Sequence, residues 1–357
     1  MPGYGFRLAD GSFVNNTIDT IHRKEPPGTL IEDLDTIPYA DWTCFDFSSY
    51  EEKYLPIMTS RGCIRRCSFC SEAPIWGKFR HRSAASIAGE MIHQAELHPE
   101  ISTFWFMDSL INGDIPMLEE LCDILIEKET AGPTGKDRGN GKFGWTGQFL
   151  VRKNMDASIW EKISRAGGQW FACGLENGSD RILRMMRKGY DRALAKEVIS
   201  TAQSVDPDLV SVAMFVVGHP GETEDDFQDT LEMITFLKGV GVSSSVSKCD
   251  IRRGSHLWFN QDAYEIVLPS DADNPDGMPW AWYSRDGSNT PEHRERLLQR
   301  TKELDATMLH TLKPGEKGLV EGGISVHFHG EEVNEPPRSM IDRVSDVILR
   351  RKPTKTP

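Results

Sequence analysis

Three cysteines that lie close together in the sequence could hold a metal cluster. Cys63, Cys67 and Cys70 are separated by three and by two residues. A closed zinc site or an ordinary four-iron cluster takes four protein ligands, so this group predicts a cluster with one metal position open to a ligand other than protein. Two alternatives remain: a zinc site completed by His81 or His93, and a chance grouping of buried thiols. The spacing differs from the paired cysteines of common zinc sites, and no second Cys-x-x-Cys follows.

The segment 63–70, Cys-Ile-Arg-Arg-Cys-Ser-Phe-Cys, resembles the Cys-x3-Cys-x2-Cys signature of the radical S-adenosylmethionine (SAM) superfamily, including its aromatic residue before the last cysteine. The resemblance implies that the three cysteines bind a [4Fe-4S] cluster whose remaining iron chelates the amino and carboxylate groups of SAM. It further implies that reductive cleavage of SAM yields a 5′-deoxyadenosyl radical. Phe69 is then expected near the SAM adenine, or as a hydrophobic plug over the cluster.

Alternating strand and helix patterns around this loop predict the elements that position it. Strand-length apolar runs occur at 57–60, 103–108, 143–151, 169–176, 209–218 and 242–251. Helical patterns lie between them at 83–97, 117–127, 156–166, 180–188, 192–204 and after Thr223. About six β/α units fit, fewer than the eight of a closed barrel. This favours an α/β fold, the partial (β/α)6 TIM-like barrel that the resemblance implies, with the cysteine loop at the carboxyl end of the first strand.

Composition divides the chain into three predicted parts. Residues 1–55 show little periodicity and contain prolines, which predicts an extended N-terminal arm or linker. Residues 56–258 form the predicted radical SAM barrel. Residues 259–357 form a small α-rich extension with a helix at 291–312 and a disordered tail from 352.

The arm also resembles the linker that joins a cobalamin-binding domain to the radical domain in cobalamin-type radical SAM proteins. The resemblance lies in residues 30–38 and 54–57. No Asp-x-His-x-x-Gly motif of a cobalamin module occurs in the sequence. We therefore expect either a shortened relative or a cobalamin supplied by a separate corrinoid protein. An arm that only packs on the core is the alternative.

Polar residues at two further strand ends are candidate ligands of SAM. Met107-Asp108-Ser109 ends the second strand, where many radical SAM proteins carry Gly-Gly-Glu. Asp108 could accept hydrogen bonds from the SAM ammonium, or it could cap the next segment. Gln148 and Arg152 lie at the end of the third strand, where a guanidinium could pair with the SAM carboxylate.

Two glycine-rich segments resemble the cobalamin-type and methylthiotransferase-like branch of the superfamily. The segment 174–179, Gly-Leu-Glu-Asn-Gly-Ser, is similar to Gly-Leu-Glu-Ser-Gly-Ser. Glu176 could bond a ribose or amino group, and Ser179 could bind the cofactor or cap the following helix. The segment 218–223, Gly-His-Pro-Gly-Glu-Thr, resembles the Gly-x-Pro-Gly-Glu-Thr turn of the same branch. There His219 could donate a proton or have a structural role.

Charge and hydropathy limit the classes of partner. The net charge of −13 argues against a general binder of nucleic acid or of anionic membranes, which need a basic surface. No run of eighteen apolar residues occurs, and the N-terminus does not resemble a secretory signal. The four remaining cysteines are scattered, which argues against a disulfide framework. We expect a soluble cytoplasmic protein.

The resemblance to the radical SAM superfamily extends over about residues 30–290 and is strongest over 57–225. The resemblance implies an enzyme that abstracts hydrogen from, or supports methyl transfer to, a small molecule or a peptide. It also implies an electron donor such as flavodoxin or ferredoxin. The alternatives are a methylthiotransferase-like radical SAM enzyme and a non-catalytic iron–sulfur or zinc-binding protein.

Overall fold

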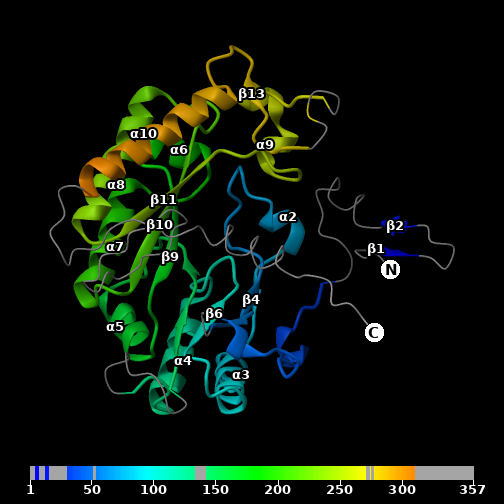
Figure 1. The fold of residues 1–357 in the computed structure, drawn as a ribbon, viewed down its shortest axis with the longest axis vertical. Coiled ribbons are helices and arrows are strands. Elements are labelled where there is room, and N and C mark those ends of the chain that lie inside the picture. Colours follow the sequence, from blue (N-terminus) through cyan, green and yellow to red (C-terminus); the bar gives the residue numbers. More distant parts are fainter. Residues whose placement is uncertain are drawn as a thin grey trace, which may run out of the picture.

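A parallel sheet that follows the order of the chain forms the centre of the molecule (Figure 1). The computed structural model describes residues 30–50, 54–132, 142–270, 274 and 277–309, together with the short antiparallel strands β1 (Gly5–Arg7) and β2 (Phe13–Asn15). The first sheet has the order β3-β6-β7 and the second the order β11-β10-β9-β8. Their bounds are β3 Tyr54–Ile57, β6 Thr103–Phe106, β7 Gly144–Thr146, β8 Gln148–Phe149, β9 Phe171–Glu176, β10 Val210–Val217 and β11 Ser243–Lys248.

The two sheets continue into each other at Gly147, where β7 ends and β8 begins. All neighbouring strands in both sheets are parallel. Among the described strands, β3 pairs only with β6 and β11 only with β10, so the barrel is open along one side. The fold is therefore the partial barrel expected from the sequence. The third predicted strand, 143–151, is broken into β7 and β8, and the first lies at 54–57 rather than 57–60.

Helices connect successive strands as the β/α pattern predicts. They are α3 Ala84–Leu97, α4 Ile115–Glu127, α5 Ala157–Arg165, α6 Asp180–Met185, α7 Arg192–Val205 and α8 Glu224–Gly239. Each begins after a side chain that accepts a hydrogen bond from the backbone of the first turn. These capping residues are Ser83, Asp114, Asp156, Ser179, Asp191 and Thr223. The sequence thus encodes where each helix starts.

The main core lies between the sheet and these helices. Along β9, Phe171, Cys173 and Leu175 are buried, and the alternate residues are partly exposed. Trp145 stacks on Phe106 with ring centroids 5.1 Å apart. One face of the sheet is therefore packed, and the other face lines the hollow side of the barrel.

Shorter elements surround the barrel mouth. The pair β4 (Ser60–Arg61) and β5 (Arg80–His81) flanks the cysteine loop, which leads into α2 (Glu72–Trp76). After β11 come α9 (His256–Phe259), η3 (Gln261–Tyr264) and the pair β12 (Ile266–Val267) and β13 (Tyr283–Ser284). Helix α10 (Pro291–Leu309) then crosses beside β11 and α8 (Figure 1). It begins at the predicted proline; residues 310–312 and the predicted disordered tail from 352 lie outside the described residues.

The arm packs on the barrel through residues 30–50, which include η1 (Leu34–Thr36) and η2 (Phe47–Ser49). The Ser83 amide donates to Asp35 at 3.0 Å, and the Ala40 amide donates to Glu90 at 3.2 Å. This part of the arm is thus attached to α3. None of the helices in the described part of the chain is long and apolar enough to cross a bilayer.

Candidate functional site

The cysteine loop follows β4 at the carboxyl end of the first barrel strand and is fixed by hydrogen bonds from three distant elements. The Ser68 amide donates to the Met186 carbonyl at 2.9 Å, and the Leu257 amide donates to the Ser68 carbonyl at 2.9 Å. The Ser68 hydroxyl lies 3.3 Å from Nε2 of His219. Gly62 precedes the loop with φ +83°, and a Cβ there would lie 2.9 Å from the Lys78 carbonyl oxygen, so glycine is required.

The three thiols of this loop are partly exposed and partly stabilised by backbone amides. The Arg65 amide donates to Cys63 Sγ and the Glu72 amide to Cys70 Sγ, each at 3.4 Å. Burial raises the pKa of Cys67, and it raises the pKa of Cys70 to about 12. Without a metal both thiols are therefore protonated at neutral pH, so metal binding must release protons.

The donor set fits a multinuclear cluster better than a single ion. Among the described residues, no three His, Cys, Asp or Glu side chains are arranged to hold one metal ion. A mononuclear zinc site needs such a convergence, and the proposed zinc ligands are engaged elsewhere: His81 Nδ1 lies 2.9 Å from the Arg82 carbonyl and His93 contacts Tyr39. In an iron–sulfur cluster the cysteines bind separate irons, so a looser set of three thiols suits it.

Phe69 lies on one wall of a cavity of about 250 Å³ next to the loop. The same cavity is lined by Cys70, by Val216 of β10 and by Asp250 and Arg252 after β11. It therefore connects the last cysteine to the carboxyl ends of the last two barrel strands. Its position agrees with the expectation that Phe69 is near a bound adenine, and that role stays a prediction.

Asp108 is bonded to the segment that enters the cysteine loop, and a role in binding SAM stays a prediction. Its carboxylate is buried and accepts hydrogen bonds from the amides and hydroxyls of both Thr59 and Ser60. Burial raises the pKa of Asp108 to about 6, although these hydrogen bonds oppose the shift. The carboxylate therefore fastens the end of β6 to the segment that enters the cysteine loop, which is neither a cap of the next segment nor a contact with SAM.

The two polar residues at the end of the third strand have different surroundings. Gln148 keeps an exposed side chain on β8. Arg152 donates from Nη1 to the carbonyls of Asn112 and Gly113, the latter at 3.0 Å, and lines a separate hollow together with Arg65. Burial, and next the nearby Arg65 cation, lower the pKa of Arg152. A role of either residue in binding SAM stays a prediction.

Glu176 ends β9 as half of a buried ion pair beside the cysteine loop. Its Oε1 lies 3.1 Å from Lys188 Nζ, with 13% and 5% of the side chains exposed. Burial lowers the pKa of Lys188, but the Glu176 carboxylate, Tyr190 and Cys67 together outweigh burial and hold that pKa above its usual value. The cation in turn favours the Cys67 thiolate. Oε2 of Glu176 accepts no hydrogen bond from any described residue, so this oxygen can receive one from a ligand.

Glu176 also has an unusual backbone. Its φ is +68°, in the left-handed region that non-glycine residues seldom adopt. A Cβ on Gly174 would collide with Oε1 of Glu176, so glycine at 174 makes room for the carboxylate. Strained residues of this kind concentrate at functional sites.

Ser179 caps α6, as one of its two predicted roles requires, and a contact with the cofactor stays a prediction. It is buried, accepts from the Arg181 amide as the cap of α6, and donates to Asp226 at 2.6 Å. Asp226 also accepts from the Arg181 guanidinium and from Thr223. These contacts join the segments 174–179 and 218–223, and we call the group Ser179, Arg181, Thr223 and Asp226 the brace.

His219 is a buried residue that links the turn after β10 to the cysteine loop. Burial lowers its pKa to about 4, so the ring is uncharged at neutral pH. Nδ1 lies 2.9 Å from the Pro220 carbonyl and must donate to it, which leaves Nε2 to accept from the Ser68 hydroxyl. The turn after β10 therefore helps to hold the cysteine loop.

The sequence reading missed a buried cation in α10. Arg294 has no exposed surface, donates to Asn289 at 2.8 Å and stacks over Trp282 with 3.9 Å between the guanidinium carbon and the ring centroid. Asn289 in turn donates to the Gly218 carbonyl at 3.0 Å, next to His219. Helical spacing could have indicated that Arg294 is buried. It lies three and seven residues before Leu297 and Thr301, which share the inner face of the helix.

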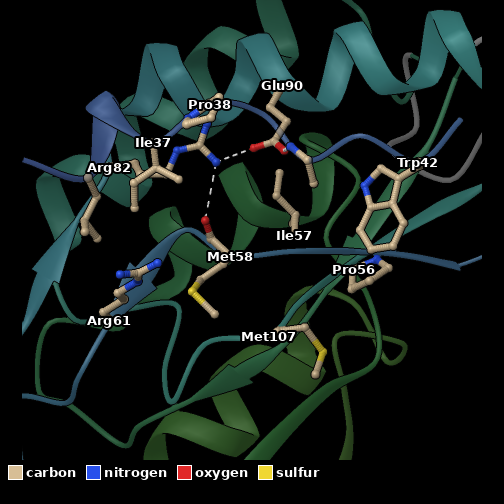
Figure 2. A pocket seen from close by; sticks show the side chains of 12 residues that line it. Ile37, Pro38, Trp42, Pro56, Ile57, Met58, Arg61, Arg82, Glu90 and Met107 are labelled. Atoms are coloured by element: carbon tan, nitrogen blue, oxygen red, sulfur yellow. Dashed lines mark hydrogen bonds and ion pairs between the residues drawn. The ribbon is translucent and has the colours of Figure 1, made fainter. Parts of the chain in front are cut away.

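A second, largely apolar hollow of about 270 Å³ lies between the arm and the open edge of the barrel (Figure 2). Met58 and Met107, which follow β3 and β6, line it together with Trp42 of the arm. Figure 2 shows the Arg82 guanidinium between the Glu90 carboxylate and the Met58 carbonyl. This buried pair fixes the wall of the hollow near the strand ends.

Comparisons with known proteins agree with this geometry. The Radical SAM superfamily matches residues 57–234. The chain is 26% identical over 227 residues to a tRNA-2-methylthio-N(6)-dimethylallyladenosine synthase of Chloroflexus aurantiacus, covering 61% of this chain and 44% of that protein. It is 26% identical over 253 residues to the uncharacterized methyltransferase PH0819 of Pyrococcus horikoshii, covering 69% and 51%. The chain thus spans about half the length of these relatives.

The fold is also similar to that of a solved enzyme. The radical SAM methyltransferase TsrM of Kitasatospora setae, solved with cobalamin and a [4Fe-4S] cluster, matches with a TM-score of 0.50 and 16% identity. The match covers 68% of this chain and 43% of that one. It shows a shared fold. Members of the superfamily use a [4Fe-4S] cluster and SAM and need a reductant.

Proposed function

Because residues 57–234 form a radical SAM domain, we propose that this protein cleaves SAM reductively and directs the resulting radical to a small-molecule or peptide substrate. The observation that supports this most strongly is the loop of Cys63, Cys67 and Cys70. It offers three partly exposed thiols, and hydrogen bonds from three other elements hold it at the carboxyl end of β3.

Cys63, Cys67 and Cys70 would bind the cluster, and the amides of Arg65 and Glu72 would stabilise two of the sulfurs. Bound there, a [4Fe-4S] cluster supplies the electron that cleaves SAM to methionine and a 5′-deoxyadenosyl radical. Phe69 and Val216 offer an apolar wall to an adenine, since both line the cavity next to Cys70. The unoccupied Oε2 of Glu176 would accept a hydrogen bond from a ribose hydroxyl or from the SAM ammonium.

The test is anaerobic reconstitution followed by an assay for 5′-deoxyadenosine. Cys67→Ala should remove the cluster and the product while changing the free energy of unfolding by only about 1 kcal/mol, because the thiol lies in a loop outside the core. Cys44→Ala is the matched control, since Cys44 is exposed and lies in the arm. Normal iron content in Cys67→Ala would refute the ligand assignment.

Methyl transfer is the second candidate reaction. It is supported by the similarity to the uncharacterized methyltransferase PH0819 across 69% of this chain. Product analysis separates the two reactions: S-adenosylhomocysteine and a methylated product that appear only with added cobalamin would indicate methyl transfer. Formation of 5′-deoxyadenosine without cobalamin would indicate hydrogen abstraction.

A further inference from the structure

A hollow of about 800 Å³ opens beside the cysteine loop, between the segment after β8 and helices α6 and α7. Cations dominate its lining: Arg65, Arg152, Lys153, Arg184 and Arg187. Asp180 and Asp191 are its acidic residues. The excess of three positive charges contrasts with the net charge of −13 for the whole chain.

Among the described residues none of these five cations forms a close ion pair, although the Asp114 carboxylate acts on Arg152 from outside the lining. Arg65 donates to the Gly189 carbonyl at 3.3 Å, and Arg187 contacts Nε2 of His256 at 2.7 Å. Asp180 and Asp191 each accept a hydrogen bond from a backbone amide at the start of α7, at 2.7 and 2.8 Å, and their two charges leave three cations in excess. The lining of the hollow therefore carries an excess of positive charge.

The hollow shares a wall with the cysteine loop. Arg65 lies in sequence between Cys63 and Cys67, and its side chain reaches across to Gly189. The loop is further bound to the end of α6, through the Ser68 amide and the Met186 carbonyl. A partner seated on the hollow would therefore contact the cysteine loop through Arg65.

We propose that this hollow is the docking surface for an acidic one-electron carrier protein, of the flavin or small iron–sulfur type, that reduces the cluster. The inference rests on the proposed function, because only a redox cluster at the three cysteines needs such a partner. The reduced carrier loses one electron and the cluster gains it, and no covalent bond is formed or broken.

Charge complementarity favours a protein over a small anion. Lys153, Arg184 and Arg187 are exposed and come from two different segments, so they form a broad charged surface. Exposed charges of this kind raise association rates with an oppositely charged protein, and electron-transfer encounters are small and transient. Elsewhere the chain is acidic and would repel the same carrier, which directs it to this surface.

The test compares two reductants on the reconstituted enzyme. The double variant Arg184→Glu and Arg187→Glu should slow cluster reduction by reduced flavodoxin at least tenfold at low salt, and this difference should shrink as salt rises. Reduction by photoreduced deazaflavin, a small molecule, should stay unchanged. The control double variant Arg296→Glu and Lys302→Glu changes the net charge equally on exposed positions of α10 and should change the flavodoxin rate less than twofold.

Equal slowing with both reductants would overturn the docking proposal, because it would assign the cations to the cluster itself or to an anionic substrate. Equal slowing in the α10 control would overturn it too, because net charge alone would then explain the effect. The proposed function fails separately, if the wild-type protein with deazaflavin yields no 5′-deoxyadenosine.

Discussion

Two buried aspartates with similar hydrogen bonding have opposite titration behaviour. Asp108 accepts from the amides and hydroxyls of Thr59 and Ser60, and Asp226 accepts from Ser179, Thr223 and Arg181. Burial raises the pKa of Asp108 to about 6. For Asp226, burial acts the same way, but the hydrogen bonds from Arg181, Ser179 and Thr223 together hold the pKa well below its usual value.

The difference indicates two separate roles: Asp108 holds the segment that enters the cysteine loop, and Asp226 stabilises the barrel through the brace. We call the group Asp108, Thr59 and Ser60 the clasp. All hydrogen-bond donors to Asp108 in the clasp are neutral, so its carboxylate ionises close to neutral pH. The brace includes a cation, so it stays charged throughout the physiological range. We therefore expect the brace to govern global stability, and the clasp to affect the loop and to respond to pH.

The largest effect is expected from Asp226→Ala. It removes the partner of Arg181, the acceptor of Ser179 and one half of the capping box of α8. Loss of a buried charge pair costs about 3 to 5 kcal/mol, and we expect about 3 kcal/mol because the Arg181 side chain is 45% exposed. Urea denaturation measures it.

Asp225→Ala, on the same helical turn, is the control for Asp226→Ala and should cost about 0.5 kcal/mol through the helix dipole alone. Iron content per folded chain should stay normal in both variants. A loss of iron from folded Asp226→Ala protein would contradict the claim that the brace stabilises the barrel without affecting the cysteine loop.

An intermediate effect is expected from pH acting on Asp108. Its folded pKa of about 6 lies above the unfolded value of 3.8, so its contribution to stability is full below about pH 4 and is lost as pH rises through 6. The loss amounts to about 2 to 3 kcal/mol. Because Asp108→Asn cannot ionise, its free energy of unfolding relative to wild type should rise by that amount between pH 4 and pH 7 in the apoprotein. A constant difference across this range would contradict the pKa assignment.

The smallest effect is expected from Ser68→Ala, which removes only the hydroxyl contact to His219. One buried hydrogen bond contributes about 1 kcal/mol, which corresponds to about a fivefold weaker retention of iron under chelator competition. Ser71→Ala is the control, because Ser71 lies directly after the last cysteine and outside this hydrogen-bond network. Equal iron loss in both variants would show that His219 does not support the loop.

The sequence predicted the barrel well because strand and helix periods and capping residues are local signals. The starts of α3 and α8 were readable from Ser83 and Thr223. The sequence alone does not distinguish a ligand from a structural residue at Asp108 and Ser179, because a polar residue after a strand looks the same whether its partner is a cofactor or a distant part of the chain. Their partners, Thr59 and Asp226, are 49 and 47 residues away, so only the fold reveals them.

The most direct test of the central claim is electron paramagnetic resonance of the reduced, reconstituted protein before and after SAM is added. Three cysteine ligands leave one iron without a protein ligand, so the account predicts a [4Fe-4S] signal whose g-values shift when SAM binds, and no such signal in Cys67→Ala. A four-iron signal that SAM does not change, or the absence of a four-iron cluster, would contradict the account.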